Sequence, residues 1–260
     1  MKTTLKLLIV LLMVPVVLFA QEKESQYIQW GGDDDIANAM VMRGMEHMMN
    51  VEIEKAYTFF DAAVAQDPTL FAPHVVLANL SGGEKRELHT AAAKKHVEGK
   101  NEVSKLFVST LDLDWQEEGA AEKNRALWAK MNELAFDGGF VNFRYAMSRK
   151  DVKEQISELE KLAAKNDKKG RSNAHIHNIL GYMQYAEGNK EKAKAHFDKY
   201  LELRPNGYNA YDSMGEYYFN EGDMETALTY YKKARMHYPA ARSANNKIEE
   251  IEEKMKAKKE

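Results

Sequence analysis

Two stretches near the C-terminus of this 260-residue chain repeat each other at one constant offset. They span 174–205 and 208–239, and glycine, alanine, aromatic and proline positions recur in both. The matching pairs are Gly181 with Gly215, Gly188 with Gly222, Ala193 with Ala227, Phe197 with Tyr231, and Pro205 with Pro239. The period lies within the range of roughly 20–50 residues that indicates a repeat protein, in which each unit is a small supersecondary structure that stacks on its neighbours.

An earlier stretch carries the same internal spacing. Gly44 and Pro68 have the same separation as the equivalent glycine and proline of the last copy, and Ala56, Phe60 and Ala63 lie between them. The small residues permit close approach of two helices, the aromatic residue is expected to fill the gap to the next repeat, and the proline ends the second helix. In this combination the three copies resemble tetratricopeptide repeats.

The resemblance implies an all-α fold, a tetratricopeptide-type solenoid of helical hairpins with a C-terminal capping helix. Long stretches rich in the helix-forming residues Ala, Leu, Glu, Lys and Met point the same way. We divide the chain into a signal peptide (1–20), a lead-in (21–36), three repeats (37–70, 174–207 and 208–241), degenerate hairpins (71–173), and a capping helix with a basic tail (242–260). In the last segment, Ala244, Ile248, Ile251 and Met255 are spaced to form one apolar face.

The middle segment, 71–173, lacks most of the repeat positions. We expect hairpins of about the same size there, and the alternative is an unrelated helical insert. Pro73 suits the first turn of a helix, and the glycine pairs at 82–83 and 138–139 predict loops. Aromatic residues gather in this segment, either as core filling or as the stacking surface of a ligand site. They are Trp115, Trp128, Phe140, Phe143 and Tyr145.

The N-terminal segment, 1–20, has the three parts of a secretory signal. Lys2 and Lys6 begin it, an apolar stretch over 7–19 follows, and Ala20 is the expected residue before cleavage. An uncleaved membrane anchor is the alternative, but the apolar stretch is shorter than the roughly 20 residues that span a bilayer. Since the chain has no cysteine, a lipid-anchored lipoprotein is excluded. We expect a periplasmic or secreted protein without a membrane span once the signal is removed.

The composition excludes several kinds of chemistry. A chain without cysteine has no disulfide, no thiol nucleophile and no Cys-ligated metal centre. A net charge of −3 offers no basic surface for nucleic acid. The eight histidines form no metal-binding motif, and Asp33–Asp35 is interpreted as the cap of the first helix. Because nucleophile-elbow and phosphate-loop motifs are also absent, we expect no catalysis, no metal and no cofactor.

The resemblance also assigns certain positions of each repeat to a concave groove that holds partner peptides. In the first repeat these are Met45, Met48 and Met49, whose thioethers suit an adaptable binding surface; core filling is the alternative. In the later repeats they are His175, Asn178, Tyr182, Tyr185, Asn209, Asp212, Glu216 and Phe219. The Lys and Asn residues with which some members of the family hold a C-terminal carboxylate are missing as a set. A basic or aromatic segment is therefore the expected occupant.

Two functions are compatible with these observations. One is an exported, non-catalytic scaffold that mediates protein–protein interaction in the bacterial envelope, although the fold does not set its partner. The other is a periplasmic protein that binds a small molecule or glycan, or an enzyme, with its site in the aromatic middle segment. Convergence of Trp115 and Trp128 on one pocket with polar groups would favour the second function.

Overall fold

The computed structural model describes residues 24–257, and over that range the chain is helical and contains no strand. The predicted signal peptide, 1–20, lies outside the described residues. The elements are α1 (Asp35–Met49), α2 (Ile53–Gln66), α3 (Phe71–Leu80), α4 (Gly83–His96), α5 (Glu102–Ser109), the 3-10 helix η1 (Thr110–Asp112), α6 (Ala120–Leu134), α7 (Gly139–Ser148), α8 (Val152–Lys168), α9 (Ala174–Ala186), α10 (Lys190–Leu203), α11 (Tyr208–Asn220), α12 (Met224–His237) and α13 (Arg242–Ala257). The predicted all-α class is confirmed.

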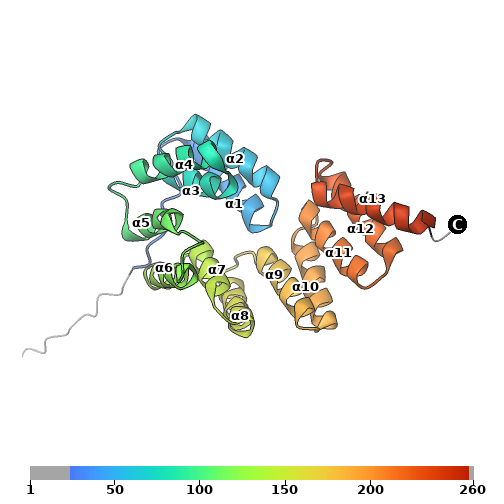
Figure 1. Ribbon diagram of the computed structural model, residues 1–260. Helices are drawn as coiled ribbons and strands as arrows, with labels where there is room; N and C mark the ends of the chain where they lie inside the picture. Colours follow the sequence, from blue (N-terminus) through green and yellow to red (C-terminus); the bar gives the residue numbers. More distant parts are fainter. Residues whose placement is uncertain (1–23, 258–260) are drawn as a thin grey trace, which may run out of the picture.

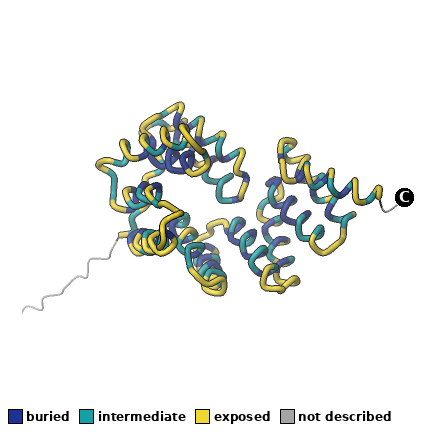
Figure 2. The backbone as a smooth tube through the Cα atoms, viewed as in Figure 1, coloured by how far each residue is buried: buried dark blue, intermediate teal, exposed yellow. Residues whose placement is uncertain are grey.

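Consecutive helices pack as hairpins and follow one another along an arc (Figure 1). The pairs α1–α2, α3–α4, α9–α10 and α11–α12 make the most extensive contacts, whereas α6, α7 and α8 pack in succession. Asp34 caps α1 by accepting a hydrogen bond from the backbone N–H of Ala37 at 2.8 Å, as the acidic run predicted. Buried residues lie on the helix faces turned toward neighbouring helices, and exposed residues follow the loops and outer faces (Figure 2).

The glycine of each repeat lies directly beneath the aromatic residue of its own hairpin. A Cβ added at Gly181 would lie 2.6 Å from the ring of Phe197, and one at Gly215 would lie 2.9 Å from the ring of Tyr231. The expectation that the aromatic residue fills the gap to the next repeat describes only part of its role. Phe197 also reaches Tyr217 of the next hairpin, with ring centroids 6.1 Å apart, but its closest packing is on its own glycine. This contact requires a residue without a side chain.

The lead-in is part of the core of the N-terminal half. Ile28 is buried, and Trp30 lies between helices that are distant in sequence. Its ring centroid is 6.5 Å from that of Phe60 on α2, 5.5 Å from that of Phe107 on α5 and 5.3 Å from that of Phe140 on α7. Trp30 therefore joins the first hairpin to the middle segment.

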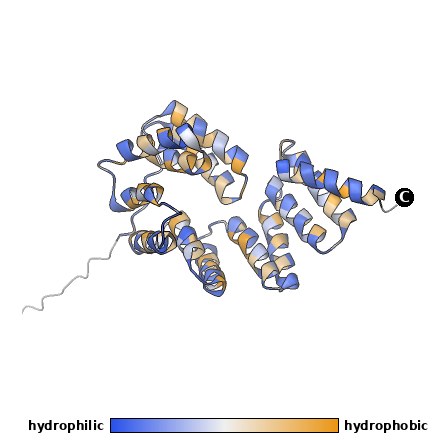
Figure 3. Cartoon of the chain, in the orientation of Figure 1, coloured by the Kyte–Doolittle hydropathy of each residue, from blue (hydrophilic) through white to orange (hydrophobic). Residues whose placement is uncertain are grey.

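The last helix covers the end of the repeat stack, as predicted. Ala244, Ile248 and Ile251 of α13 are buried against α12, and Met255 packs beside them. The rest of α13 is hydrophilic (Figure 3). A polar outer face over an apolar contact is what a terminal cap of a solenoid requires.

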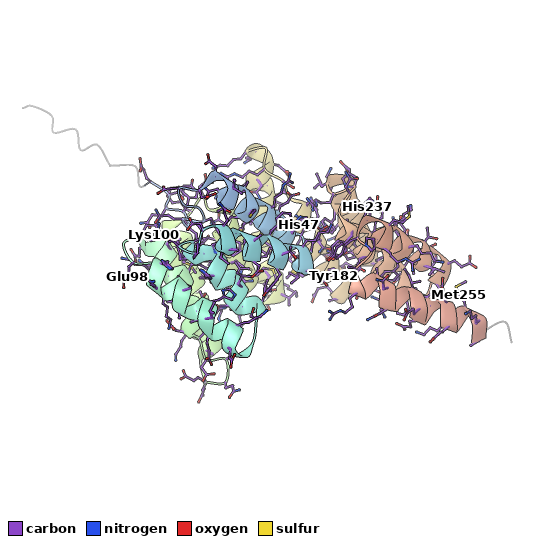
Figure 4. The ribbon with its side chains drawn as sticks, turned by 90° about the horizontal axis from the view of Figure 1, so that it is seen from above. His47, Glu98, Lys100, Tyr182, His237 and Met255 are labelled. Carbon is purple, nitrogen blue, oxygen red and sulfur yellow. The ribbon has the colours of Figure 1, made fainter. Side chains whose placement is uncertain are left out.

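The arc curves until its first hairpin contacts its later repeats, which lie far along the chain. The hydroxyl group of Tyr200, on α10, donates a buried hydrogen bond to the backbone oxygen of Asn50 at 3.0 Å. Arg204 follows α10 and forms ion pairs with Glu46 on α1 and with the buried Glu52, the latter at 3.5 Å. Figure 4 labels His47 on α1 and Tyr182 on α9, on either side of the junction between the two halves. We call this contact the closure.

Candidate functional site

A hollow of about 400 Å³ lies where the N-terminal hairpins, the middle helices and α9 face one another. We call it the central hollow. Its wall is drawn from α1, α2, α3, α5, η1, the loop after η1, α6, α7 and α9. The lining residues are Met48, Met49, Val51, Ile53, Val76, Asn79, Leu80, Phe107, Thr110, Leu113, Trp115, Asn124, Trp128, Phe140, Phe143, Arg144, Met147 and Ile179. Most are apolar, and the volume lies at the lower end of the roughly 300–1,000 Å³ range of ligand pockets.

Four of the five aromatic residues singled out in the middle segment line the central hollow. Trp128 is buried in its wall, and Phe140 and Phe143 are partly buried beside it. Trp115 is 64% exposed, a large aromatic surface left open to a ligand. Tyr145, the fifth, does not line the hollow and packs against the core of the N-terminal half.

The polar groups of the lining are largely occupied by the protein itself. Asn124 accepts the indole N–H of Trp128 at 3.0 Å, Asn79 donates to the backbone oxygen of Val75 at 3.1 Å, and Thr110 donates to the backbone of its own helical turn. Arg144 is the sole charged residue of the lining, which contains no acidic residue, lysine or histidine. The hollow therefore offers apolar surface and one cation.

The methionines of the first helix divide between this hollow and the core. Met48 and Met49 line the central hollow at the end of α1. Met45 is partly buried and packs against the core between α1 and α2. Met48 packs against that core as well, so core filling accounts for Met45 and for part of the surface of Met48.

In the C-terminal repeats, two of the predicted groove residues are buried within the protein. Asn178 is 1% exposed and accepts the hydroxyl hydrogen of Ser213 at 2.9 Å. Asp212 is 7% exposed and accepts a hydrogen bond from Ser243 of α13 at 3.1 Å. Burial raises the pKa of Asp212 to about 6, because a carboxylate loses its hydration there. These side chains join α9 to α11 and α11 to α13, and they are closed to a partner.

The predicted groove tyrosines are also engaged by neighbouring repeats. Tyr182 donates its hydroxyl hydrogen to Glu216 at 2.8 Å, and Tyr185 donates to Glu221 at 2.8 Å. Burial raises the pKa of Tyr182 well above its usual value, so its hydroxyl group stays protonated as a donor. The remaining residues of the set are Asn209, which donates to Tyr200 at 3.3 Å, Phe219, which lies beneath Lys247 and Lys254, and His175, whose ring meets Phe143 edge-on.

Two histidine pairs join the helices of two hairpins, and the sequence analysis did not find them. The Nδ1 atoms of His74 and His89 are 2.9 Å apart, and those of His177 and His196 are 3.0 Å apart. Burial lowers the pKa of all four imidazoles, which favours the neutral form that lets one ring donate to the other. Within 24–257, no group of three or more His, Asp or Glu side chains is placed to hold a metal ion.

Stacked helical hairpins arranged around a concave hollow define the class as a helical-repeat protein. The sequence profile of the tetratricopeptide repeat matches residues 174–206 and 208–234, which contain α9 to α12. These two stretches are tetratricopeptide repeats, and the rest of the described chain continues the stack of helices. No curated protein matches it significantly.

Several solved structures are similar to this chain at low sequence identity, and one of them has a TM-score above 0.5. The yeast protein Tom70 matches with a TM-score of 0.52 and 12% identity, over 88% of this chain and 51% of its own. PilW, a widely conserved type IV pilus biogenesis factor, matches with a TM-score of 0.45 and 12% identity, over 82% of this chain and 99% of its own. MamA matches with a TM-score of 0.38 and 16% identity, over 78% of this chain and 91% of its own.

Among the helices of residues 24–257, none has the length and apolar character needed to cross a bilayer.

Proposed function

We propose that this protein is a non-catalytic scaffold that binds a protein partner by seating an apolar segment of that partner in the central hollow. The single observation that supports the proposal is the lining of the hollow, which gathers apolar side chains from helices between α1 and α9. Interfaces gain most of their binding free energy from a few anchor side chains that fill such pockets. Trp115 supplies exposed aromatic surface for that contact.

The chemistry of the lining favours an apolar protein segment over a glycan or an enzyme substrate. A sugar needs several polar groups with free hydrogen-bonding capacity, whereas the lining has few polar residues, and Asn79, Thr110 and Asn124 each use part of that capacity within the protein. General acid–base catalysis needs a titratable group within reach of the substrate. The lining has no carboxylate, imidazole or amine to serve as one.

Comparing two exposed positions tests this proposal. Trp115 is 64% exposed and lines the hollow, whereas Met236 is 81% exposed on α12 and lies outside it. Both side chains contribute little to the folded core, so replacing either with alanine should leave the melting temperature nearly unchanged. Proteins from the native cell that bind the purified wild-type protein and the Met236→Ala variant, but not the Trp115→Ala variant, would support the central hollow as the site. Partners that bind all three equally would contradict it.

We also propose that the protein acts in the bacterial envelope after export. The support comes from the basic residues and apolar stretch of segment 1–20. Sequencing the N-terminus of the protein from a periplasmic extract tests this proposal. A cytoplasmic protein that retains Met1 would contradict it.

A further inference from the structure

We propose that the segment seated in the central hollow carries a carboxylate side chain next to its apolar anchor, and that Arg144 pairs with this carboxylate. The inference rests on the proposed function and names the chemistry of the partner. It is supported by the position of Arg144, by the absence of an ionic partner for it in residues 24–257, and by the apolar surface around it.

Arg144 belongs to the stripe of α7 that faces the hollow. Phe140, Phe143 and Met147 lie close to it along α7 and line the same wall. Residues one helical turn apart share one side of a helix. The guanidinium carbon lies 5.1 Å from the ring centroid of Trp128, so its charge is held over the aromatic floor of the hollow.

Several other basic residues of α7, α8 and the loop after α8 have acidic partners. Arg149, at the end of α7, pairs with Glu154 at 3.1 Å. Lys169 and Arg171 pair with Asp137 at 2.6 and 3.1 Å. In the part of the chain that the structure describes, Arg144 forms no ion pair, and its one charge interaction is with the ring of Trp128. It is the cation available to a ligand in the hollow.

A carboxylate satisfies this geometry better than a neutral or basic group. The planar guanidinium group presents paired N–H donors that match the two oxygens of a carboxylate. Arg144 is exposed and therefore open to a partner, and an apolar segment that covers the hollow would exclude water and strengthen the attraction. Since Arg144 lies over Trp128, the carboxylate must be close to the side chain that covers the aromatic floor. The expected partner segment therefore has an Asp or Glu adjacent or nearly adjacent in sequence to a large apolar or aromatic residue.

This chemistry differs from that expected of the predicted groove. The acidic residues Asp212 and Glu216 led us to expect a basic or aromatic occupant in the C-terminal repeats. Asp212 is buried and Glu216 accepts a hydrogen bond from Tyr182, so both carboxylates are held by contacts within the repeats. The partner segment of the central hollow is still expected to carry a large apolar or aromatic side chain. Its charged residue is now expected to be acidic, whereas the predicted groove led us to expect a basic one.

Selection from a displayed library of random peptides tests the inference directly. The purified wild-type protein should enrich peptides that combine a large apolar residue with a neighbouring Asp or Glu. Selected peptides should bind the Arg144→Gln variant about tenfold more weakly in fluorescence anisotropy, because a charge-assisted bidentate contact is lost. The Arg144→Glu variant should enrich Lys or Arg at the same position instead. Arg242→Glu, an exposed change at the start of α13 outside the hollow, is the matched control and should keep the wild-type preference.

The outcomes separate this inference from the proposed function. Apolar peptides that depend on Trp115 but tolerate Arg144→Glu would overturn the carboxylate and leave the scaffold in place. No enriched peptide, together with no cellular partner that depends on Trp115, would overturn both. Binding of laurate that depends on Arg144, without any enriched peptide, would assign the hollow to a small amphiphile and refute the inference. Unchanged melting temperatures of the Arg144 variants show that altered binding is not caused by unfolding.

Discussion

Replacing Gly181 with alanine adds one methyl group to α9 at a point where the ring of Phe197 leaves no room. The new Cβ would lie 2.6, 2.7 and 2.9 Å from three ring atoms, whereas ordinary contact begins near 3.4 Å. Phe197 is 2% exposed and meets Tyr182 edge-on, with ring centroids 4.9 Å apart. To restore an ordinary contact, the buried ring or the helix must therefore move by about 0.8 Å.

Two effects of opposite sign set the size of the change. Adding atoms to a packed core costs roughly 1–3 kcal/mol. Replacing glycine with alanine inside a helix stabilises by about 1 kcal/mol. Because the close contacts involve a buried ring and not the flexible end of a side chain, overpacking should cost about 2–3 kcal/mol here. The free energy of unfolding should fall by about 1–2 kcal/mol, a loss of very roughly 2–8 °C in melting temperature.

Urea denaturation followed by circular dichroism at the helix band measures this loss. Gly139→Ala is the matched control, because Gly139 is the first residue of α7 and a Cβ there meets nothing within 4 Å. The control should match the wild type or exceed it by up to about 1 kcal/mol. Phe197→Leu, combined with Gly181→Ala, should recover part of the loss by removing the crowded ring. If Gly181→Ala is as stable as Gly139→Ala, the close packing of Phe197 on Gly181 is refuted.

Three further predictions concern charge. Burial lowers the pKa of His175 to about 4, and an unfolded histidine binds its proton near 6.5, so the melting temperature should fall as the pH is lowered from 7 to 4.5; a constant melting temperature would contradict this. Asp212→Asn should stabilise the protein by at most about 3 kcal/mol above pH 6, because burial raises the pKa of this carboxyl from 3.8 to about 6, and the gain should vanish near pH 3.5. A gain that persists at pH 3.5 would argue against a buried charge at Asp212. Arg204→Met should lower the free energy of unfolding by about 1.5–3 kcal/mol, because the buried Glu52 loses one of its partners and keeps His47; an effect no larger than that of the exposed Arg242→Met would disprove the closure.

The repeated hairpins could be predicted from the sequence because their defining residues contact each other within one hairpin. Gly181 and Phe197 belong to the same hairpin, so their spacing recurs wherever the hairpin recurs. The cap was predictable for a similar reason, since an apolar stripe on a charged helix indicates one buried face. The aromatic residues of the middle segment were recognised as candidates from their clustering alone.

Contacts between distant segments could not be predicted in this way. Trp30 packs on α2, α5 and α7, which lie far along the chain. The histidine pairs each lie within one hairpin, but their two spacings differ, so no repeated pattern marks them. The groove residues Asn178 and Asp212 occupy the expected repeat positions, yet how closely the next helix covers them depends on the curvature of the whole arc. Arg144 gave no signal either, because its importance lies in the absence of a nearby acidic residue.

The closure also changes how the protein folds. In an open solenoid each repeat touches only its neighbours, so stability is nearly a sum of local terms and unfolding can begin at either end. Here the bond from Tyr200 to Asn50 spans 150 residues, and its loop-closure entropy has to be offset by contacts that form together. The first hairpin and the later repeats should therefore unfold as one cooperative unit, and folding should be slower than in open arrays of equal length. A partner that inserts at the junction of the two halves would act on the stability of the whole chain.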